Sequence, residues 1–171
     1  MITRKIAHYF PDAQWNWPSE GDYATLQWFG PGEKPTEAEL AALPWPVITT
    51  DDVDAERDRR IEAGMTFNGV RYQTRAQDRE NVAGASIMAL AAITQGAQPG
   101  DLRWHGGSTD FVWIAEDNSL TPMDAQTFFA FGQAMAAHKS ALIFAARALK
   151  DMTEIPGDYA TNETYWPGEP T

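Results

Sequence analysis

Two groups of residues in this chain carry side chains whose types and spacing could do chemistry, and the first is acidic. Asp51, Asp52, Asp54 and Glu56 could attract a hard cation such as calcium. The run lacks the loop glycine and the closing glutamate of an EF-hand. Because acidic side chains stabilise the positive end of a helix dipole, the run is interpreted as a solvated helix start.

The second group contains two histidines. His105-Gly106-Gly107 is similar to the oxyanion-hole turn of some hydrolases, but the chain contains no Gly-x-Ser-x-Gly elbow, so we predict a hairpin loop there. His138 has no acidic residue or second histidine three or four residues away on its helix face, which favours a partly buried core histidine over a metal ligand. We therefore predict no catalytic, cofactor-binding or metal-binding residue, and a protein that is not an enzyme.

Composition narrows the possible partners. The chain has 171 residues with 13 Lys and Arg against 24 Asp and Glu, a net charge of -11, and no basic cluster that could track phosphates. Nucleic acid is therefore not expected as a partner. The chain has no cysteine, so disulfides and thiolate metal sites are excluded. The most apolar stretch, residues 83–93, is too short to span a bilayer, and we predict a soluble protein without a membrane partner.

The first 48 residues are predicted to form an aromatic N-terminal lobe. Tyr23–Trp28 is its best strand candidate, and Thr36 with Glu39 predicts a capping box for a short helix that ends at Leu43. Tryptophans in the lobe and aromatics near the C-terminus could form a small core or could dock a protein or a sugar. These docking candidates are Trp15, Trp17, Trp28, Trp45, Tyr165 and Trp166.

A connector helix is predicted over residues 49–64. It is capped by Thr50 or Asp51 and closed by Gly64. A hairpin follows over residues 65–74, because Asn68-Gly69 supplies the two positive-φ residues of a type I′ turn.

A module over residues 65–152 contains this hairpin and two main helices. One helix is predicted over residues 76–95, capped by Thr74, with apolar positions at Val82, Ile87, Leu90 and Ile93 and small residues that allow a close neighbour.

Short strands at Leu102–Trp104 and Asp110–Ala115 follow that helix in the prediction. The second main helix is predicted over residues 122–152, with Thr121 as its cap and Pro122 at its first position. The predicted fold class is α+β, with short antiparallel strands packed against the two helices. Residues 153–171 are predicted to form an extended arm.

Apolar residues recur at spacings of three and four along the second main helix, which is typical of a packing seam. The helix of residues 76–95 could cover this seam within the chain, or two or more copies could pair along it to give a trimer or a hexamer. The seam residues are Phe128, Phe131, Met135, His138, Leu142 and Leu149.

Three local patterns carry a family resemblance: the Ala63–Tyr72 hairpin, the Trp113–Asn118 strand and turn, and the Leu120-Thr121 start of a helix. In this order they resemble the DUF4376 domain over about residues 57–152. That domain has no assigned function and occurs in many tailed bacteriophage and prophage proteins, often near tail-fibre genes. Residues 34–40 are also similar to a short segment of phage tail-region proteins.

The resemblance implies a setting rather than a reaction. It implies a bacteriophage tail-associated structural protein, a component for fibre or tail-tip attachment that contacts other tail proteins. Such a protein would be made in the host bacterial cytoplasm and retained in the virion. Two alternatives stay open: a tail-fibre assembly chaperone that leaves the virion, and a tail module that binds host glycans through its tryptophans.

Overall fold

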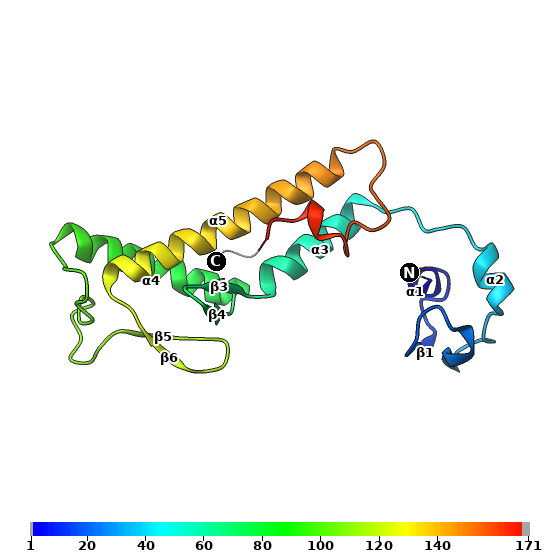
Figure 1. Cartoon of the computed structure of the whole chain (residues 1–171), viewed down its shortest axis with the longest axis horizontal. Helices are drawn as coiled ribbons and strands as arrows, with labels where there is room; N and C mark the ends of the chain where they lie inside the picture. Colours follow the sequence, from blue (N-terminus) through cyan, green and yellow to red (C-terminus); the bar gives the residue numbers. More distant parts are fainter. Residues whose placement is uncertain (1, 169–171) are drawn as a thin grey trace. The chain divides into compact units, whose positions relative to one another are not determined.

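The computed structural model describes residues 2–168 and confirms the α+β class. The chain divides into two compact units, Met1–Val47 and Ile48–Thr171. The described residues contain five α-helices and three two-stranded antiparallel sheets. The two long helices, α4 and α5, pack together in the second unit (Figure 1).

Short elements make up the first unit. They are α1 (Thr3–Tyr9), β1 (Gln14–Asn16), the 3-10 turn η1 (Tyr23–Thr25), β2 (Gln27–Gly30) and α2 (Glu37–Ala42).

Two local predictions in this unit have opposite outcomes. The strand predicted over Tyr23–Trp28 is wrong in its first half, because the Asp22 side chain accepts a hydrogen bond from Ala24 N and closes a 3-10 turn. The Thr36 capping box is confirmed: Glu39 N donates to Thr36 Oγ1 at 3.2 Å, and Thr36 N donates to a Glu39 carboxylate oxygen at 2.7 Å.

An apolar cluster of its own holds the first unit together. Ile6, Trp17, Leu26 and Leu40 are buried in it. Lys5 is buried beside them because its ammonium group donates to the carbonyl of Leu40 at 3.0 Å and its charge is thereby solvated by the backbone.

Three helices form the frame of the second unit: α3 (Thr50–Glu62), α4 (Ala76–Thr94) and α5 (Ala125–Lys150). Both α3 and α4 pack against α5 (Figure 1). The cap of α3 is Thr49 rather than Thr50 or Asp51, since Asp52 N donates to Thr49 Oγ1 at 3.2 Å.

A buried threonine joins the end of α3 to the following hairpin. Thr74 was predicted to cap α4, but the N-cap is Arg75. The Thr74 hydroxyl accepts from Gly64 N at 2.9 Å and donates to Ile61 O at 2.6 Å. Gly64 ends α3 as predicted, with φ +91, and a Cβ there would lie 3.0 Å from Tyr72 O.

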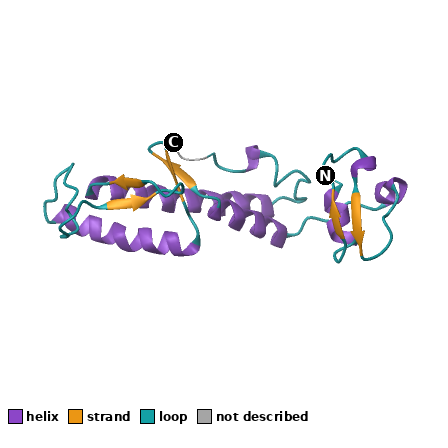
Figure 2. Cartoon of the chain, turned by 90° about the horizontal axis from the view of Figure 1, so that it is seen from below, coloured by secondary structure: helices purple, strands orange, loops and turns teal. Residues whose placement is uncertain are grey.

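Two hairpins complete the second unit, and they stay separate (Figure 2). In the first, β3 (Met65–Phe67) pairs with β4 (Val70–Tyr72). The predicted type I′ turn is confirmed, because Asn68 and Gly69 have φ of 49 and 75. In the second hairpin, β5 (Val112–Ile114) pairs with β6 (Leu120–Pro122).

Two predictions around the second hairpin are wrong. Leu102–Trp104 forms turns rather than a strand, because the Asp101 side chain accepts from Arg103 N at 2.8 Å and Gly106 N donates to Arg103 O at 2.9 Å. Thr121 and Pro122 belong to β6, and α5 begins three residues later than predicted, with Asp124 as its N-cap.

Asp124 links the start of α5 to the loop that precedes the second hairpin. One carboxylate oxygen accepts from Thr127 N at 2.7 Å and the other from Gly100 N at 2.7 Å. Burial raises the pKa of Asp124, but the hydrogen bonds from Thr127 and Gly100 outweigh it, so the pKa lies below its ordinary value. The side chain therefore remains ionised and holds both segments together.

Candidate functional site

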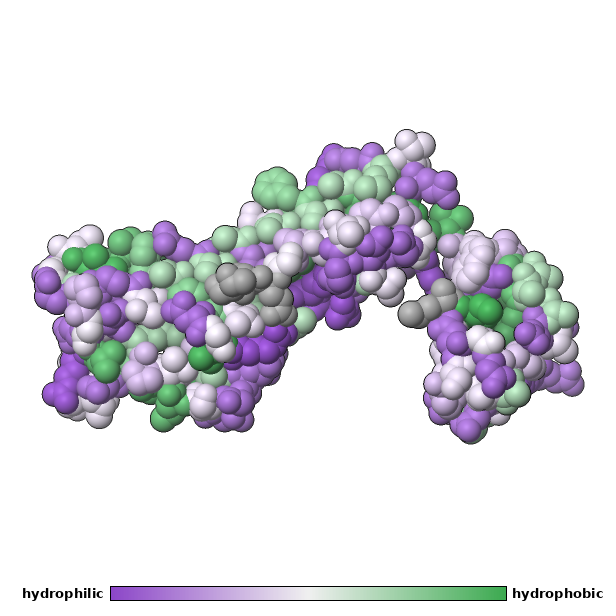
Figure 3. All heavy atoms as spheres, in the orientation of Figure 1, coloured by the Kyte–Doolittle hydropathy of each residue, from purple (hydrophilic) through white to green (hydrophobic). Residues whose placement is uncertain are grey.

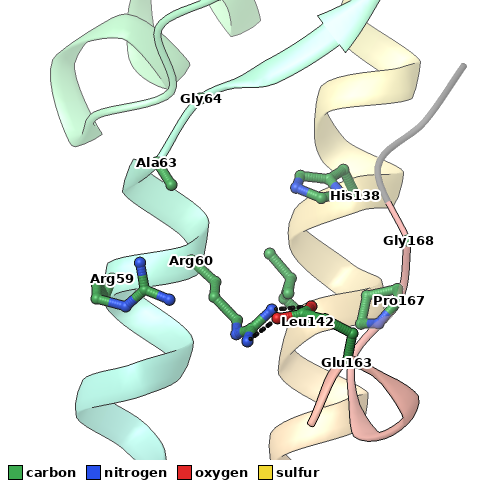
Figure 4. A pocket seen from close by; sticks show the side chains of 9 residues that line it. All are labelled: Arg59, Arg60, Ala63, Gly64, His138, Leu142, Glu163, Pro167 and Gly168. Atoms are coloured by element: carbon green, nitrogen blue, oxygen red, sulfur yellow. Dashed lines mark hydrogen bonds and ion pairs between the residues drawn. The ribbon is translucent and has the colours of Figure 1, made fainter. Parts of the chain in front are cut away.

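A cavity lies between α3, α5 and the chain that follows α5, and ionisable side chains from all three segments line it (Figure 4). Its volume is about 250 Å³. Arg59 and Arg60 reach it from α3, His138 and Leu142 line it from α5, and Glu163 closes it from the C-terminal segment. That segment, residues 151–168, contains the 3-10 turn η2 (Glu163–Tyr165).

Arg60 connects α3 to the C-terminal segment. Its guanidinium donates to both carboxylate oxygens of Glu163, at 2.7 and 2.8 Å, and to Ala160 O at 3.1 Å. The same group donates to Glu56 at 2.7 Å and lies 4.7 Å from the centre of the Trp166 ring. All these partners come from this chain, so the guanidinium works as a clamp rather than as an open anion site.

The charges around Arg60 stabilise one another's ionised forms. Burial raises the pKa of Glu56, but hydrogen bonds from Arg59 and Arg60 outweigh it and lower that pKa. The hydrogen bond from Arg60 lowers the pKa of Glu163 and, reciprocally, raises the pKa of Arg60.

Aromatic side chains fasten the C-terminal segment in addition to the clamp. Trp166 is buried with Val53, Ile61 and Leu149, and its indole N–H donates to Tyr159 O at 2.7 Å. The Tyr159 hydroxyl in turn donates to Asp52 O on α3 at 3.2 Å. The segment that sequence suggested as an extended arm thus lies against α3 and α5 in residues 151–168.

Three of the four acidic residues at the start of α3 are used inside the fold. Asp52 completes the cap with Thr49, Asp54 pairs with Lys150 at 2.6 Å, and Glu56 pairs with the two arginines. Among the described residues, no group of three or more His, Asp or Glu side chains is placed to hold a metal ion.

The two histidines considered in the sequence lie in different parts of the second unit. His138 is half-buried and lines the cavity. His105 lies between the rings of Trp104 and Phe111, with centroids 5.9 and 5.5 Å away, in a loop where Gly106 adopts φ +79.

The seam of α5 is covered by residues of the same chain. Phe128, Phe131 and Met135 are buried in one cluster with Tyr72 and Val82. Leu142 and Leu149 are buried in the second cluster, against α3 and the C-terminal segment. A second copy therefore cannot reach these side chains without displacing the chain's own elements.

The docking aromatics differ in exposure. Trp17 and Trp166 are buried, Trp15 and Trp28 are partly buried in the cluster of the first unit, and Tyr165 is partly buried in that of the second. Trp45 is 58% exposed, with the Lys5 ammonium 4.5 Å from its ring centre. Of the six, it is the aromatic ring most open to a ligand.

Apolar side chains are exposed on two surfaces that the sequence did not single out. On α4 the outward residues include Ile87, which is 71% exposed, and Leu90, which is 44% exposed. On the second hairpin the cross-strand pairs Val112/Pro122 and Ile114/Leu120 share an exposed face. Figure 3 shows apolar atoms at the surface over these parts of the second unit.

These features define a small α+β domain in which α3 and α4 pack against α5. Ionisable side chains form ion pairs that connect its segments, and some apolar side chains are exposed at its surface. A family model described as Domain of unknown function (DUF4376) matches residues 47–165, well over half of the chain. The chain belongs to this family. The match takes in α3 and most of the C-terminal segment as well as the core of the module.

The other comparisons add no relative: no curated protein and no solved structure matches the chain. None of the helices in residues 2–168 combines the length and apolarity that crossing a bilayer requires.

Proposed function

We propose that this chain is a bacteriophage tail-associated structural protein that attaches or adapts other tail proteins through protein–protein contacts. In this proposal the chain is made in the host bacterial cytoplasm, assembles as an oligomer and stays in the tail of the virion. It is a proposal of a contact-making protein, not of an enzyme.

One observation carries the contact-making role. In the second unit, Arg60, Asp54 and Asp124 are used in pairs and caps that brace the fold, while apolar side chains are displayed on a strand face and on a helix face. Exposed apolar patches of this kind mark protein interaction sites. Such a distribution favours binding to another macromolecule over turnover of a small one.

The phage setting is supported by the resemblance of the hairpin, strand and helix signatures to a domain common in phage tail-region proteins. The family match extends over all elements that carry those signatures. This support comes from shared family membership, so a separate experiment tests whether the chain is part of a phage tail.

The test is the protein composition of the particle. Virions from the phage or prophage that encodes the chain should be purified and analysed by mass spectrometry, and peptides of this chain should appear at a fixed ratio to a known tail protein. A double variant, Ile114→Asp with Leu120→Asp, should lower that ratio. Ile114→Val with Leu120→Met keeps the strand face apolar and is the matched control. Absence of the chain from infectious particles would overturn the structural role.

Two alternatives remain distinguishable. A fibre-assembly chaperone would bind fibre protein in the infected cell and be absent from virions. A host-glycan-binding module is favoured by one observation, the exposed ring of Trp45, and predicts sugar binding that Trp45→Ala abolishes while Trp17→Phe, in the core of the same unit, leaves it intact.

A further inference from the structure

The outer surface of α4 is the most unusual surface of the second unit. Its inner face, including Val82, Ala85 and Ala89, packs on the first core cluster with α5. The opposite face presents Ile87 and Met88, which are 71% and 56% exposed. From Asn81 to Gln95 the helix contains no charged residue.

A helix that is apolar on all sides normally has a neighbour on more than one side. Here α5 covers one side of α4 and leaves the other open. Ile87, Met88 and Leu90 are therefore in excess of what the core of the second unit uses in the described residues.

The outer face has a symmetric pattern of sizes. The two large side chains, Ile87 and Met88, are adjacent at its middle, and the small residues Gly84 and Ala91 lie three positions to either side. A Cβ at Gly84 would meet nothing within 4 Å in the chain itself, so packing inside the chain does not explain this glycine.

The same symmetry extends to the polar ends of the face. Asn81 and Thr94 lie six positions from the middle pair, and Glu80 and Gln95 lie seven positions from it. A helix with this pattern is complementary to a copy of itself that runs in the opposite direction. Large side chains would meet at the two-fold axis, and Gly84 and Ala91 would form the shallow positions on both sides.

The absence of charge from Asn81 to Gln95 is compatible with the same occupant. Each chain carries a net charge of -11, so two copies repel one another unless they meet on an uncharged surface. In the antiparallel arrangement Glu80 lies opposite Gln95 of the second copy, and no carboxylate faces another.

We propose that two copies of this chain associate through the outer faces of their α4 helices, antiparallel about a two-fold axis between Ile87 and Met88. A 19-residue helix is about 28 Å long, so the contact is small and gives a reversible monomer–dimer equilibrium. The proposal deepens the proposed function, on which its biological setting rests. A two-fold contact is compatible with a hexamer and does not by itself build a trimer.

The first test measures self-association by sedimentation velocity over a concentration series. Ile87→Asp combined with Met88→Asp should weaken the dimer at least tenfold, because four carboxylates would meet at the axis. Phe144→Asp is the matched control: this residue is also 71% exposed on a helix but lies on α5, and its variant should dimerise like the unchanged chain. Circular dichroism should show all three proteins folded.

The second test determines the relative orientation of the two α4 helices by disulfide cross-linking. The chain has no cysteine, so every disulfide comes from an introduced residue. Gly84 and Ala91 are seven residues, or about 10 Å, apart along the helix, farther than a disulfide spans. A mixture of Gly84→Cys and Ala91→Cys chains should therefore give a heterodimer, whereas each variant alone should not cross-link. Homodimers of Gly84→Cys alone would indicate parallel helices and overturn the proposal.

Other outcomes also decide the matter. A chain that stays monomeric at every concentration, or a dimer that Phe144→Asp abolishes and the α4 variant does not, would overturn the contact. If the unchanged chain is monomeric but the Ile87→Asp, Met88→Asp variant is lost from virions, the outer face of α4 binds a different protein and the dimer proposal is overturned. The two proposals fail separately, because virions can contain a monomeric chain, and a cross-linked dimer can be absent from virions.

Discussion

Arg60 shows how a single residue fixes the position of a segment a hundred residues away in sequence. Four hydrogen bonds from its guanidinium are divided among Glu56 on α3, Ala160 and Glu163, and its Cζ atom lies 4.7 Å from the centre of the Trp166 ring. Lysine has the charge but not the planar fork. The position of the C-terminal segment against α3 therefore depends on an arginine, not only on a cation.

The clamp should respond to acid. The pKa of Glu163 is lowered in the folded chain by the hydrogen bond from Arg60, so its contribution is fully present above the unfolded pKa of about 4.3. That contribution is lost as the pH falls through the lowered folded pKa. Fluorescence of Trp166 should consequently report a loosening of the C-terminal segment as the pH falls below the unfolded pKa.

Glu163→Gln removes the titrating carboxylate while nearly keeping its shape, and is the control for this loosening. The variant should release the segment more readily at neutral pH and show less change between pH 5 and pH 3. The other tryptophans can be replaced by phenylalanine to isolate the signal. An acid transition of equal size in the variant would assign the effect to other carboxylates.

Phe131 tests whether the α5 seam belongs to the core. Its ring is fully buried, 4.6 Å from the Tyr72 ring centre and 5.7 Å from that of Phe128. Phe131→Asp should unfold the second unit, because it buries an unpaired charge at a cost comparable to a domain's whole stability of about 5–15 kcal/mol. Circular dichroism with light scattering measures this. Phe144→Asp on the exposed face of the same helix should remain folded, and a folded, soluble Phe131→Asp chain would contradict a core position.

At the level of elements, the crossing of α4 and α5 depends on a glycine. A Cβ on Gly132 would overlap the hydroxyl of Ser86 and lie 3.0 Å from its Cβ, so Gly132 sets how closely the helices approach. Gly132→Ala should destabilise the second unit by about 1–3 kcal/mol despite the better helix propensity of alanine. Chemical denaturation measures the change.

Gly84 is the matched control for Gly132. It lies in α4, but no atom of the chain is within 4 Å of a Cβ built there, so Gly84→Ala should stabilise the unit by about 0.5–1 kcal/mol. Ser86→Ala should partly rescue Gly132→Ala, because it removes the hydroxyl that the new methyl group overlaps. Equal effects of the two glycine substitutions would contradict the close crossing.

The elements also show which parts of the fold the sequence could predict. Asn68-Gly69, Thr36 and Gly64 act on their nearest neighbours, and their turn, cap and helix end were predicted correctly. Thr121-Pro122 also satisfied the rule for a helix start, but both residues belong to β6, which pairs with β5. The partner residues in β5 lie only six to ten positions earlier, but the rule for a helix start considers the residues of the start alone and does not weigh strand pairing.

The candidate site was harder to predict than the fold. Ion pairing of Arg60 with Glu163 spans 103 positions, and no local pattern indicates it. Which side of α4 faces inward could not be derived either, because apolar residues lie all round the helix. The absence of charge from Asn81 to Gln95 was the available signal for the exposed apolar face that we propose as a contact.

At the scale of the whole molecule, the chain has separate cores. Ile6, Trp17, Leu26 and Leu40 form the core of the first unit, and the buried clusters of the second contain residues after Val47 alone. The family match begins at residue 47, one position before the second unit begins at Ile48. Division of the cores at this point predicts that the family domain folds without the residues that precede it.

A chain that starts at Ile48 should accordingly keep its helical circular dichroism and melt within a few degrees of the main transition of the full chain. Calorimetry of the full chain should show a second, smaller transition at lower temperature, because a unit of fewer than 50 residues buries a small fraction of its surface. Trp17→Ala, which opens the first core, should shift that small transition and leave the main one in place. A single transition that moves with Trp17→Ala would instead mean that both units unfold as one cooperative body.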